Sequence, residues 1–180
     1  MNKNLQKKLQ EQIRVIPDFP LKGIMFQDIF SITENPKLFK DVINELSGLC
    51  KKHKITKVVG IEARGFIFGS LVAYKNSIPF VPIRKKDKLP GKIIKKKYKL
   101  EYGTDQIEIQ KHSILNSDKV MIIDDLIATG GTAIASCKLL KSLTSKKLTF
   151  CFVIDLHNLG GSKKLKSLNN NVVSIINAVG

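Results

Sequence analysis

The sequence has few cysteines and no long hydrophobic run, and each absence excludes a class of protein. Its three cysteines, Cys50, Cys137 and Cys151, are isolated, and no CxxC spacing joins any two of them. A disulfide framework or a zinc site is therefore not expected, and a reducing cytoplasm fits this pattern. Nowhere do about 18 apolar residues follow one another, so no transmembrane helix is predicted. The polar start, MNKNLQKKLQEQI, predicts an amphipathic helix and not a secretory signal.

Acidic residues and arginines are also scarce. The chain has 31 basic and 15 acidic residues, a formal charge of +16, and all its basic residues except Arg14, Arg64 and Arg84 are lysines. This excess fits an anionic partner, such as a phosphate compound or a nucleic acid, but we favour compositional drift towards a solvated lysine surface. Apart from Tyr98 and Tyr102, no aromatic residues alternate with the lysines as a base-stacking surface requires. Dedicated nucleic-acid binding is therefore not expected.

What the sequence does contain is an alternation of short apolar strands and helices, within a length of 180 residues that suits one domain. The apolar segments are β-branched and show little polar alternation, which is typical of strands buried on both faces of a parallel sheet. We predict a single α/β domain with a mostly parallel central sheet flanked by helices. The expected strands are 57–63, 80–84, 119–125 and 149–155, and the expected helices are 36–53, 65–75 and 130–143.

Two stretches interrupt this alternation. Residues 1–35 contain prolines and glycines in quick succession and belong to no strand–helix unit, so we expect a small hood packed against the sheet. Residues 85–110 are basic, and residues 102–105 are expected to form the turn between two extended arms. We interpret this long excursion as a flexible lid hairpin, and an ornamental surface hairpin is the alternative.

Polar groups follow the third predicted strand. Parallel α/β sheets bind ligands at the carboxyl ends of their strands, beside helix amino termini. Gly130 and Gly131 allow the backbone to approach an anion closely, and the N–H groups of residues 128–132 are suited to cradle a phosphate. Asp124 and Asp125 would repel a bare phosphate but suit ribose hydroxyls or a hydrated magnesium ion. A plain turn after a polar strand end is the alternative.

The first two predicted strands end in basic residues. Arg64 follows the first strand, and its guanidinium is suited to phosphate, although a surface pair with Glu62 is the alternative. The second strand brings Arg84, Lys85 and Lys88 to the same edge of the sheet. A ligand with a phosphate at one end and a diphosphate at the other would match these three strand ends.

The segment VMIIDDLIATGGT, residues 120–132, closely resembles the phosphoribosyl-diphosphate-binding motif of the type I phosphoribosyltransferases. Four further segments, PDFPLKGIMFQDI, VVGIEARGFIFG, RKKDKLP and LEYGTDQIEI, are similar to those of the adenine phosphoribosyltransferases and occur in their order over nearly the whole chain. The resemblance implies a purine salvage enzyme that transfers the 5-phosphoribosyl group to adenine, giving AMP and diphosphate. It also implies Mg²⁺ bound mainly through substrate and water, without direct protein ligands, and a homodimer.

The same resemblance implies roles for individual residues. Phe26 and Gln27 would hold adenine in the hood, and the catalytic Glu101 and Tyr102 would lie on the lid. Glu101 is the candidate for taking the adenine N9 proton or stabilising the cationic ribosyl centre, unless it is only a strand residue of an exposed hairpin. Arg84 and Lys88 can act across the homodimer interface. Phosphoribosyl diphosphate would contact Arg64, Arg84, Lys85, Lys88, Asp124, Asp125, Ala128, Thr129, Gly130, Gly131 and Thr132.

Two other functions are compatible with parts of the sequence. One is a regulator with the phosphoribosyltransferase fold that binds the sugar phosphate without turnover; such proteins commonly carry an added DNA-binding module, for which 180 residues leave no room. The other is a basic RNA-binding protein, which would show steeply salt-dependent RNA affinity. The solitary His53, His112 and His157 are assigned no role.

Two residues depart from the family pattern, Gln27 where arginine is usual and Asp87 where glycine is usual. Asp87 places an acidic group beside the diphosphate region. Glutamine cannot replace a permanent charge, so we expect weaker ligand binding at the hood without loss of activity. Gln27→Arg should therefore lower the Michaelis constant for adenine or for phosphoribosyl diphosphate in steady-state kinetics. An unchanged or higher constant for both substrates would contradict this interpretation.

Overall fold

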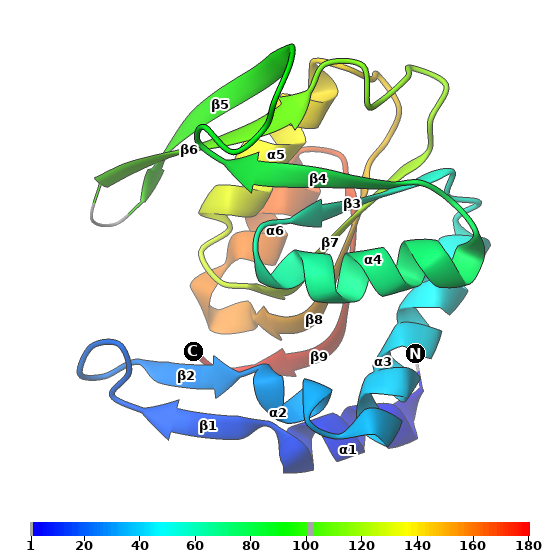
Figure 1. Cartoon of the computed structure of the whole chain (residues 1–180). Helices are drawn as coiled ribbons and strands as arrows, with labels where there is room; N and C mark the ends of the chain where they lie inside the picture. Colours follow the sequence, from blue (N-terminus) through cyan, green and yellow to red (C-terminus); the bar gives the residue numbers. More distant parts are fainter. Residues whose placement is uncertain (1, 101–102) are drawn as a thin grey trace.

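The computed structural model describes residues 2–100 and 103–180, so the predicted catalytic Glu101 and Tyr102 lie outside the described residues. Its central sheet has seven strands in the order β5-β6-β4-β3-β7-β8-β9 (Figure 1). Five of them run parallel, and β5 and β6 form an antiparallel hairpin that pairs with β4 through β6. This confirms the predicted α/β class. The parallel strands are β3 (Lys57–Ile61), β4 (Phe80–Lys85), β7 (Val120–Ile127), β8 (Thr149–Leu156) and β9 (Asn171–Ala178).

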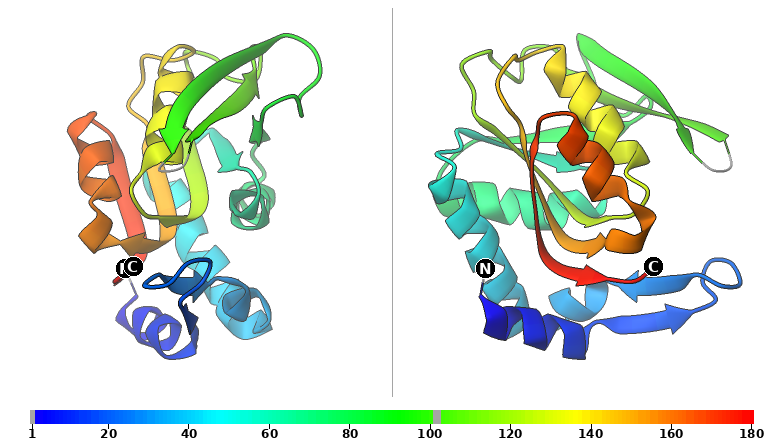
Figure 2. Two further views of the ribbon diagram at one scale, coloured as in Figure 1. Left: turned by 90° about the vertical axis from the view of Figure 1, so that its left-hand side faces the viewer. Right: turned by 180° about the vertical axis from the view of Figure 1, so that it is seen from behind.

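Helices cover both faces of the sheet (Figures 1 and 2). On one face α3 (Pro36–Lys52) and α4 (Arg64–Asn76) pack with Met121 and Ile123 of β7. On the other face α5 (Gly131–Lys141) and α6 (Gly161–Ser167) pack with Phe150 and Phe152 of β8. The strands are therefore apolar on both sides, which explains their lack of alternation. The helix α3 begins as expected, with Pro36 in its first turn and the Asn35 side chain accepting the Leu38 N–H at 3.1 Å.

The first third of the described chain includes a hood beside the sheet. It comprises α1 (Lys3–Gln12), the antiparallel pair β1 (Arg14–Pro17) and β2 (Met25–Asp28), and α2 (Phe30–Thr33). Arg14 joins these elements, because its guanidinium donates to Asp28 at 2.7 and 3.0 Å and to Glu34 at 2.9 Å. The C-terminus lies beside β2 (Figures 1 and 2). The hood is therefore placed next to the carboxyl ends of the last strands of the sheet.

The predicted position of the hairpin turn is wrong, and several elements were not predicted from the sequence. Residues 103–105 belong to β6 (Gly103–Gln110), which pairs with β5 (Ile93–Leu100) as far as Leu100 opposite Gly103. The pairing extends this far because Tyr98 and Asp105 face each other and are hydrogen-bonded at 3.0 Å. Among the elements that were not predicted are α6, which is short and lysine-rich, and β9, which follows a run of asparagines.

Two further expectations concern cysteines and membranes. The three cysteines are free and buried. Within residues 2–100 and 103–180, no helix combines the length and the apolar character needed to cross a membrane.

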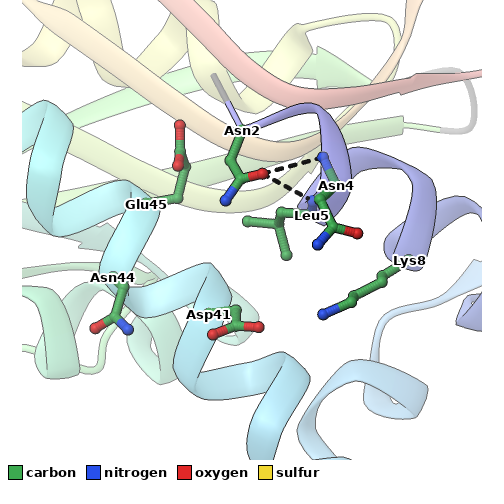
Figure 3. A pocket seen from close by; sticks show the side chains of 7 residues that line it. All are labelled: Asn2, Asn4, Leu5, Lys8, Asp41, Asn44 and Glu45. Carbon is green, nitrogen blue, oxygen red and sulfur yellow. Dashed lines mark hydrogen bonds between the residues drawn. The ribbon is translucent and has the colours of Figure 1, made fainter.

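A polar pocket of about 260 Å³ lies between α1 and α3 (Figure 3). Lys8 reaches it from α1, and Asp41, Asn44 and Glu45 reach it from α3. The pocket is far from the carboxyl ends of the parallel strands, where the polar groups identified in the sequence gather (Figure 1). It is therefore not the candidate functional site.

A buried clamp fixes the start of β3 to the loop before β7. The Asp118 carboxylate accepts hydrogen bonds from Thr56 Oγ1 at 3.0 Å and from the Leu115 N–H at 2.7 Å. Lys57 Nζ lies 2.9 Å from Asp118 Oδ2, and the Asp118 side chain is only 11% exposed. Burial by itself would raise the pKa of Asp118, but these donors outweigh it and lower the pKa.

Asp118→Asn is expected to lower the free energy of unfolding near pH 7 by about 1–3 kcal/mol, because Lys57 loses its buried partner. The folded-state pKa of Asp118 is lowered, so its contribution is present above the unfolded pKa of about 3.9 and disappears as the pH falls through the lower folded value. Urea unfolding near neutral pH and at about pH 3 measures both effects. Asp87→Asn, at a side chain that is 76% exposed, is the matched control. Equal losses in the two variants would refute the clamp.

Candidate active site

The carboxyl ends of β3 and β7 lie side by side at the centre of the sheet. From β3 the chain passes through α4 to β4 on one side, and from β7 it passes through α5 to β8 on the other (Figure 1). Such a switch point leaves a crevice in which open α/β sheets bind ligands. Gly60 pairs with Ile123, so Arg64 and Asp125 reach the same edge. The approach is close, since a Cβ on Gly65 would lie 2.5 Å from the Ile123 carbonyl oxygen.

Arg64 and Asp125 form an ion pair at this switch point. Arg64 Nε lies 2.8 Å from Asp125 Oδ2; the Asp125 side chain is 3% exposed and that of Arg64 is 34% exposed. The contact is an ion pair by distance, but within the described chain no donor is aligned to make a hydrogen bond with Asp125 Oδ2. A buried carboxylate oxygen without a donor is costly. A ligand hydroxyl at this edge would supply the missing hydrogen bond.

Asp124 lies next to this pair and accepts the Asp125 backbone N–H at 3.0 Å. Burial and the neighbouring charge of Asp125 raise the pKa of Asp124 well above its usual value. Burial also raises the pKa of Asp125, although Arg64 opposes that shift. The half-buried Asp124 and the buried Asp125 therefore bring two negative charges close together, which favours hydroxyl donors or a cation as ligands.

The loop of residues 128–132 leads from β7 into α5. Gly130 has a φ of 87°, and a Cβ there would lie 2.9 Å from Gly161 Cα. The Gly161 N–H donates to the Ala128 carbonyl at 3.1 Å, which fixes the loop against the start of α6. Gly130 is also the N-cap of α5, and no side chain of the described residues caps that helix. The first N–H groups of α5 are thus available to an anion. The sequence analysis missed Gly161, although the Gly160–Gly161 pair was a visible signal.

Glu62 organises the basic residues at the end of β4. Its carboxylate accepts hydrogen bonds from Lys88 Nζ at 3.0 Å, from the Lys85 backbone N–H at 2.8 Å and from two Arg84 nitrogens at 3.3 Å. Burial would raise the pKa of Glu62, but these donors lower it to about 2. The alternative pairing of Glu62 with Arg64 is therefore wrong, because β4 supplies the partners of Glu62 and β7 supplies the partner of Arg64.

The Lys85 side chain belongs to a second network. Its ammonium group pairs with the Asp105 carboxylate and donates to Tyr98 Oη at 3.0 Å. Tyr98 Oη also donates to Asp105 Oδ2 at 3.0 Å and accepts from Thr132 Oγ1 at 3.2 Å. One chain of contacts thus joins β4, the hairpin and the loop after β7. The sequence analysis missed Tyr98 and Asp105 as parts of the site, since nothing local to them indicated these partners.

Asp87 occupies the turn after β4 with a φ of 59°. This left-handed conformation explains why glycine is usual at the position in the family pattern, and aspartate tolerates it better than most residues. Its carboxylate lies 3.6 Å from Lys86 Nζ. An open hollow of about 460 Å³ adjoins the turn and is lined by Lys86, Asp87, Lys95, Lys97, Thr104, Asp105 and Gln106.

The predicted adenine-binding residues lie in β2 of the hood. Phe26 is half-buried, and its ring meets that of Phe19 edge to face at 5.1 Å. Gln27 is 7% exposed, and its Nε2 lies 3.4 Å from the carbonyl oxygens of Met25 and Val179. An arginine at position 27 could use the same carbonyl acceptors.

The structure therefore brings most of the predicted residues to one edge of the sheet. Arg64, Asp124, Asp125 and residues 128–132 lie at the switch point, and Lys85 joins them through Tyr98. Arg84 and Lys88 are turned to Glu62. In the described ranges no group of three or more His, Cys, Asp or Glu residues could hold a metal ion.

Comparison with known proteins agrees with this geometry. Residues 29–178 match the family described as "Phosphoribosyl transferase domain". The chain is 47% identical to the adenine phosphoribosyltransferase of Rhizobium meliloti (strain 1021) over 172 residues, which is 96% of each chain. The crystal structure of adenine phosphoribosyltransferase from Rhodothermus marinus superposes with a TM-score of 0.89 at 40% identity, covering 98% of this chain and 100% of that one. The Saccharomyces cerevisiae enzyme, complexed with an imino-altritol bisphosphate and adenine, superposes with a TM-score of 0.88 at 38% identity, over 97% and 99%.

Asp124→Asn is expected to raise the stability of the fold and to weaken ligand binding at the site. The pKa of Asp124 is raised in the folded state, so the wild-type protein loses stability as the pH rises from the unfolded pKa of about 3.9 through the folded value. The variant has no carboxyl group at this position, so it does not lose stability in this way. Its thermal midpoint at about pH 8 should exceed that of the wild type by several degrees, since about 1 kcal/mol corresponds to roughly 2–4 °C at this chain length. The gain should shrink near pH 4.

Differential scanning calorimetry at the two pH values measures this effect. Asp125→Asn is the matched comparison, because it removes a neighbouring charge but leaves Arg64 without its partner, and its gain should be smaller. A midpoint for Asp124→Asn below that of the wild type at the higher pH would contradict the proposed strain of the acidic pair.

Proposed function

We propose a role for each part of this site from one premise: the chain belongs to the phosphoribosyl transferase domain family and, within it, to the adenine phosphoribosyltransferases. It is a purine salvage enzyme that forms AMP and diphosphate from adenine and phosphoribosyl diphosphate. One observation supports the residue assignments. The start of α5, which no side chain of the described residues caps, lies at the same switch point as Arg64 and the neighbouring Asp124 and Asp125.

The ribose 5-phosphate binds at the loop of residues 128–132. Within the described structure no side chain caps the N–H groups at the start of α5. These N–H groups form the positive end of the helix dipole, which favours an anion. The ribose hydroxyls bind at Asp124 and Asp125. A hydroxyl donating to Asp125 Oδ2 satisfies the buried oxygen that lacks an aligned donor. Phosphate and hydroxyls together hold the sugar in one orientation.

Arg64, Lys85, Arg84 and Lys88 bind the diphosphate. Arg64 is partly exposed and leaves Asp125 when a ribose hydroxyl takes its place. Glu62, with its pKa of about 2, stays ionised and holds Arg84 and Lys88 in position until the diphosphate competes for them. Cations held in place beforehand stabilise the charge of the departing diphosphate at little reorganisation cost. Departure leaves an oxocarbenium-like centre that adenine N9 captures, so alignment of the two reactants is the second contribution.

Mg²⁺ accompanies phosphoribosyl diphosphate in this proposal. The acidic pair supplies only two adjacent carboxylates, and Mg²⁺ commonly binds through one or two carboxylates, several waters and substrate phosphates. When bound, the ion supplies further neutralisation of the diphosphate charge.

Adenine binds between the hood and the sheet. Phe26 offers an apolar ring surface, and the backbone of β2 offers N–H and carbonyl groups to the edge of the base. Glu101 remains the candidate for taking the N9 proton or stabilising the cationic ribosyl centre, and with Tyr102 it lies outside the described residues.

We also propose that the enzyme is a cytoplasmic homodimer. Free, buried cysteines fit a reducing compartment. The hood exposes 40–50% of six apolar side chains, which a second copy of the chain could cover: Val15, Ile16, Phe19, Leu21, Ile24 and Met25. Arg84 and Lys88 would then act across the interface, as implied by the family resemblance.

A panel of bases tests the proposed function. Purified protein is incubated with phosphoribosyl diphosphate, Mg²⁺ and either adenine, hypoxanthine, guanine or no base, and diphosphate release is followed. Release should require a base and should be fastest with adenine. No release with adenine would overturn the activity and favour the non-catalytic regulator. Equal release without a base would show hydrolysis in place of transfer.

A further inference from the structure

The Tyr98 hydroxyl has its full complement of hydrogen bonds. A tyrosine hydroxyl has one hydrogen to donate and accepts up to two. Tyr98 Oη donates to Asp105 Oδ2 at 3.0 Å and accepts from Lys85 Nζ at 3.0 Å and from Thr132 Oγ1 at 3.2 Å. Lys85 Nζ lies 5.7 Å from the centre of the ring, so it approaches the hydroxyl end and not the aromatic face. Tyr98 in the hairpin is therefore hydrogen-bonded both to Lys85 of β4 and to Thr132 of the proposed phosphate-binding loop, residues 128–132.

The bond from Thr132 to Tyr98 uses the only hydroxyl hydrogen of Thr132. A phosphate oxygen has no hydrogen to offer in the dianionic state, so Thr132 can bond it only by donating. Thr132 must then give up its bond to Tyr98. Tyr98 cannot reverse that bond, because its own hydrogen is held by Asp105, and neighbouring donors lower the Asp105 pKa and keep it ionised. A phosphate bond from Thr132 and the Tyr98–Thr132 bond therefore exclude each other.

We propose that Tyr98 is a positioning residue that couples occupancy of the 5-phosphate subsite to the attachment of the β5–β6 hairpin. In the structure the Tyr98 hydroxyl ties the hairpin to the loop of residues 128–132, and a bound 5-phosphate would break that bond by accepting the Thr132 hydrogen. Tyr98 stands three residues before the predicted catalytic Glu101 in the sequence. Filling the phosphate subsite thus loosens the hairpin of β5 and β6. The proposal rests on the assignment of residues 128–132 to the 5-phosphate.

Calorimetric titration with ribose 5-phosphate tests the coupling. Tyr98→Phe keeps the ring, which packs against the core beside α5, and removes only the hydroxyl. Without the competing bond, the variant should bind ribose 5-phosphate about 2- to 10-fold more tightly, the equivalent of one ordinary hydrogen bond. Thr132→Val should bind more weakly than the wild type. Tyr98→Phe added to Thr132→Val should cause no further change, because the hydroxyl that Tyr98 restrains is already absent.

Tyr74→Phe is the control, since the Tyr74 side chain is 83% exposed and belongs to the end of α4; it should leave the affinity unchanged. In wild-type protein labelled with 3-fluorotyrosine, saturation with ribose 5-phosphate should shift the ¹⁹F signal of Tyr98 but not that of Tyr74. Unchanged or weaker binding by Tyr98→Phe, or a gain that persists beside Thr132→Val, would overturn the coupling. If the wild type itself does not bind ribose 5-phosphate, the phosphate assignment fails together with the coupling.

Discussion

The contact on which the whole site depends is the ion pair between Arg64 and Asp125 across the switch point of the sheet. It joins the start of α4 to β7, and it partly offsets the negative charge of the two neighbouring aspartates in the last part of β7. A buried ion pair seldom adds much to stability, because desolvation consumes most of the attraction. In the proposed function its value is preparation: Arg64 is held where the diphosphate would bind, and Asp125 is held where a ribose hydroxyl would bind. Each ligand group would then replace one partner of the pair.

Other basic residues of the site are also paired with carboxylates. Arg84 and Lys88 are held by Glu62, and Lys85 is held by Asp105, so each of these cations has a carboxylate partner before any ligand binds. In a chain with a formal charge of +16, such partners limit repulsion among basic residues gathered at one edge. They also keep the side chains ordered, which would lower the entropic cost of binding the proposed diphosphate. That diphosphate would have to compete with each carboxylate for its cation.

The sequence was sufficient to predict the sheet, the helices between its strands, and the loop from Asp124 to Thr132, because these features depend on local patterns of apolar residues, glycines and strand-end polar groups. It was not sufficient for pairings between distant residues. The partner of Glu62 depends on the order of strands, which places β4 beside β3. The bond between Tyr98 and Thr132 joins residues 34 positions apart. The hairpin turn was misplaced because Gly103 and Thr104, ordinary turn residues, belong to the paired strand β6.

The most direct test of the account is a crystal structure of the protein with phosphoribosyl diphosphate and Mg²⁺. The account predicts the 5-phosphate within hydrogen-bond distance of the backbone N–H groups of residues 129–132, the ribose hydroxyls on Asp124 and Asp125, and Arg64 turned from Asp125 to the diphosphate. A 5-phosphate bound elsewhere, or Arg64 still paired with Asp125 beside a fully bound ligand, would contradict it.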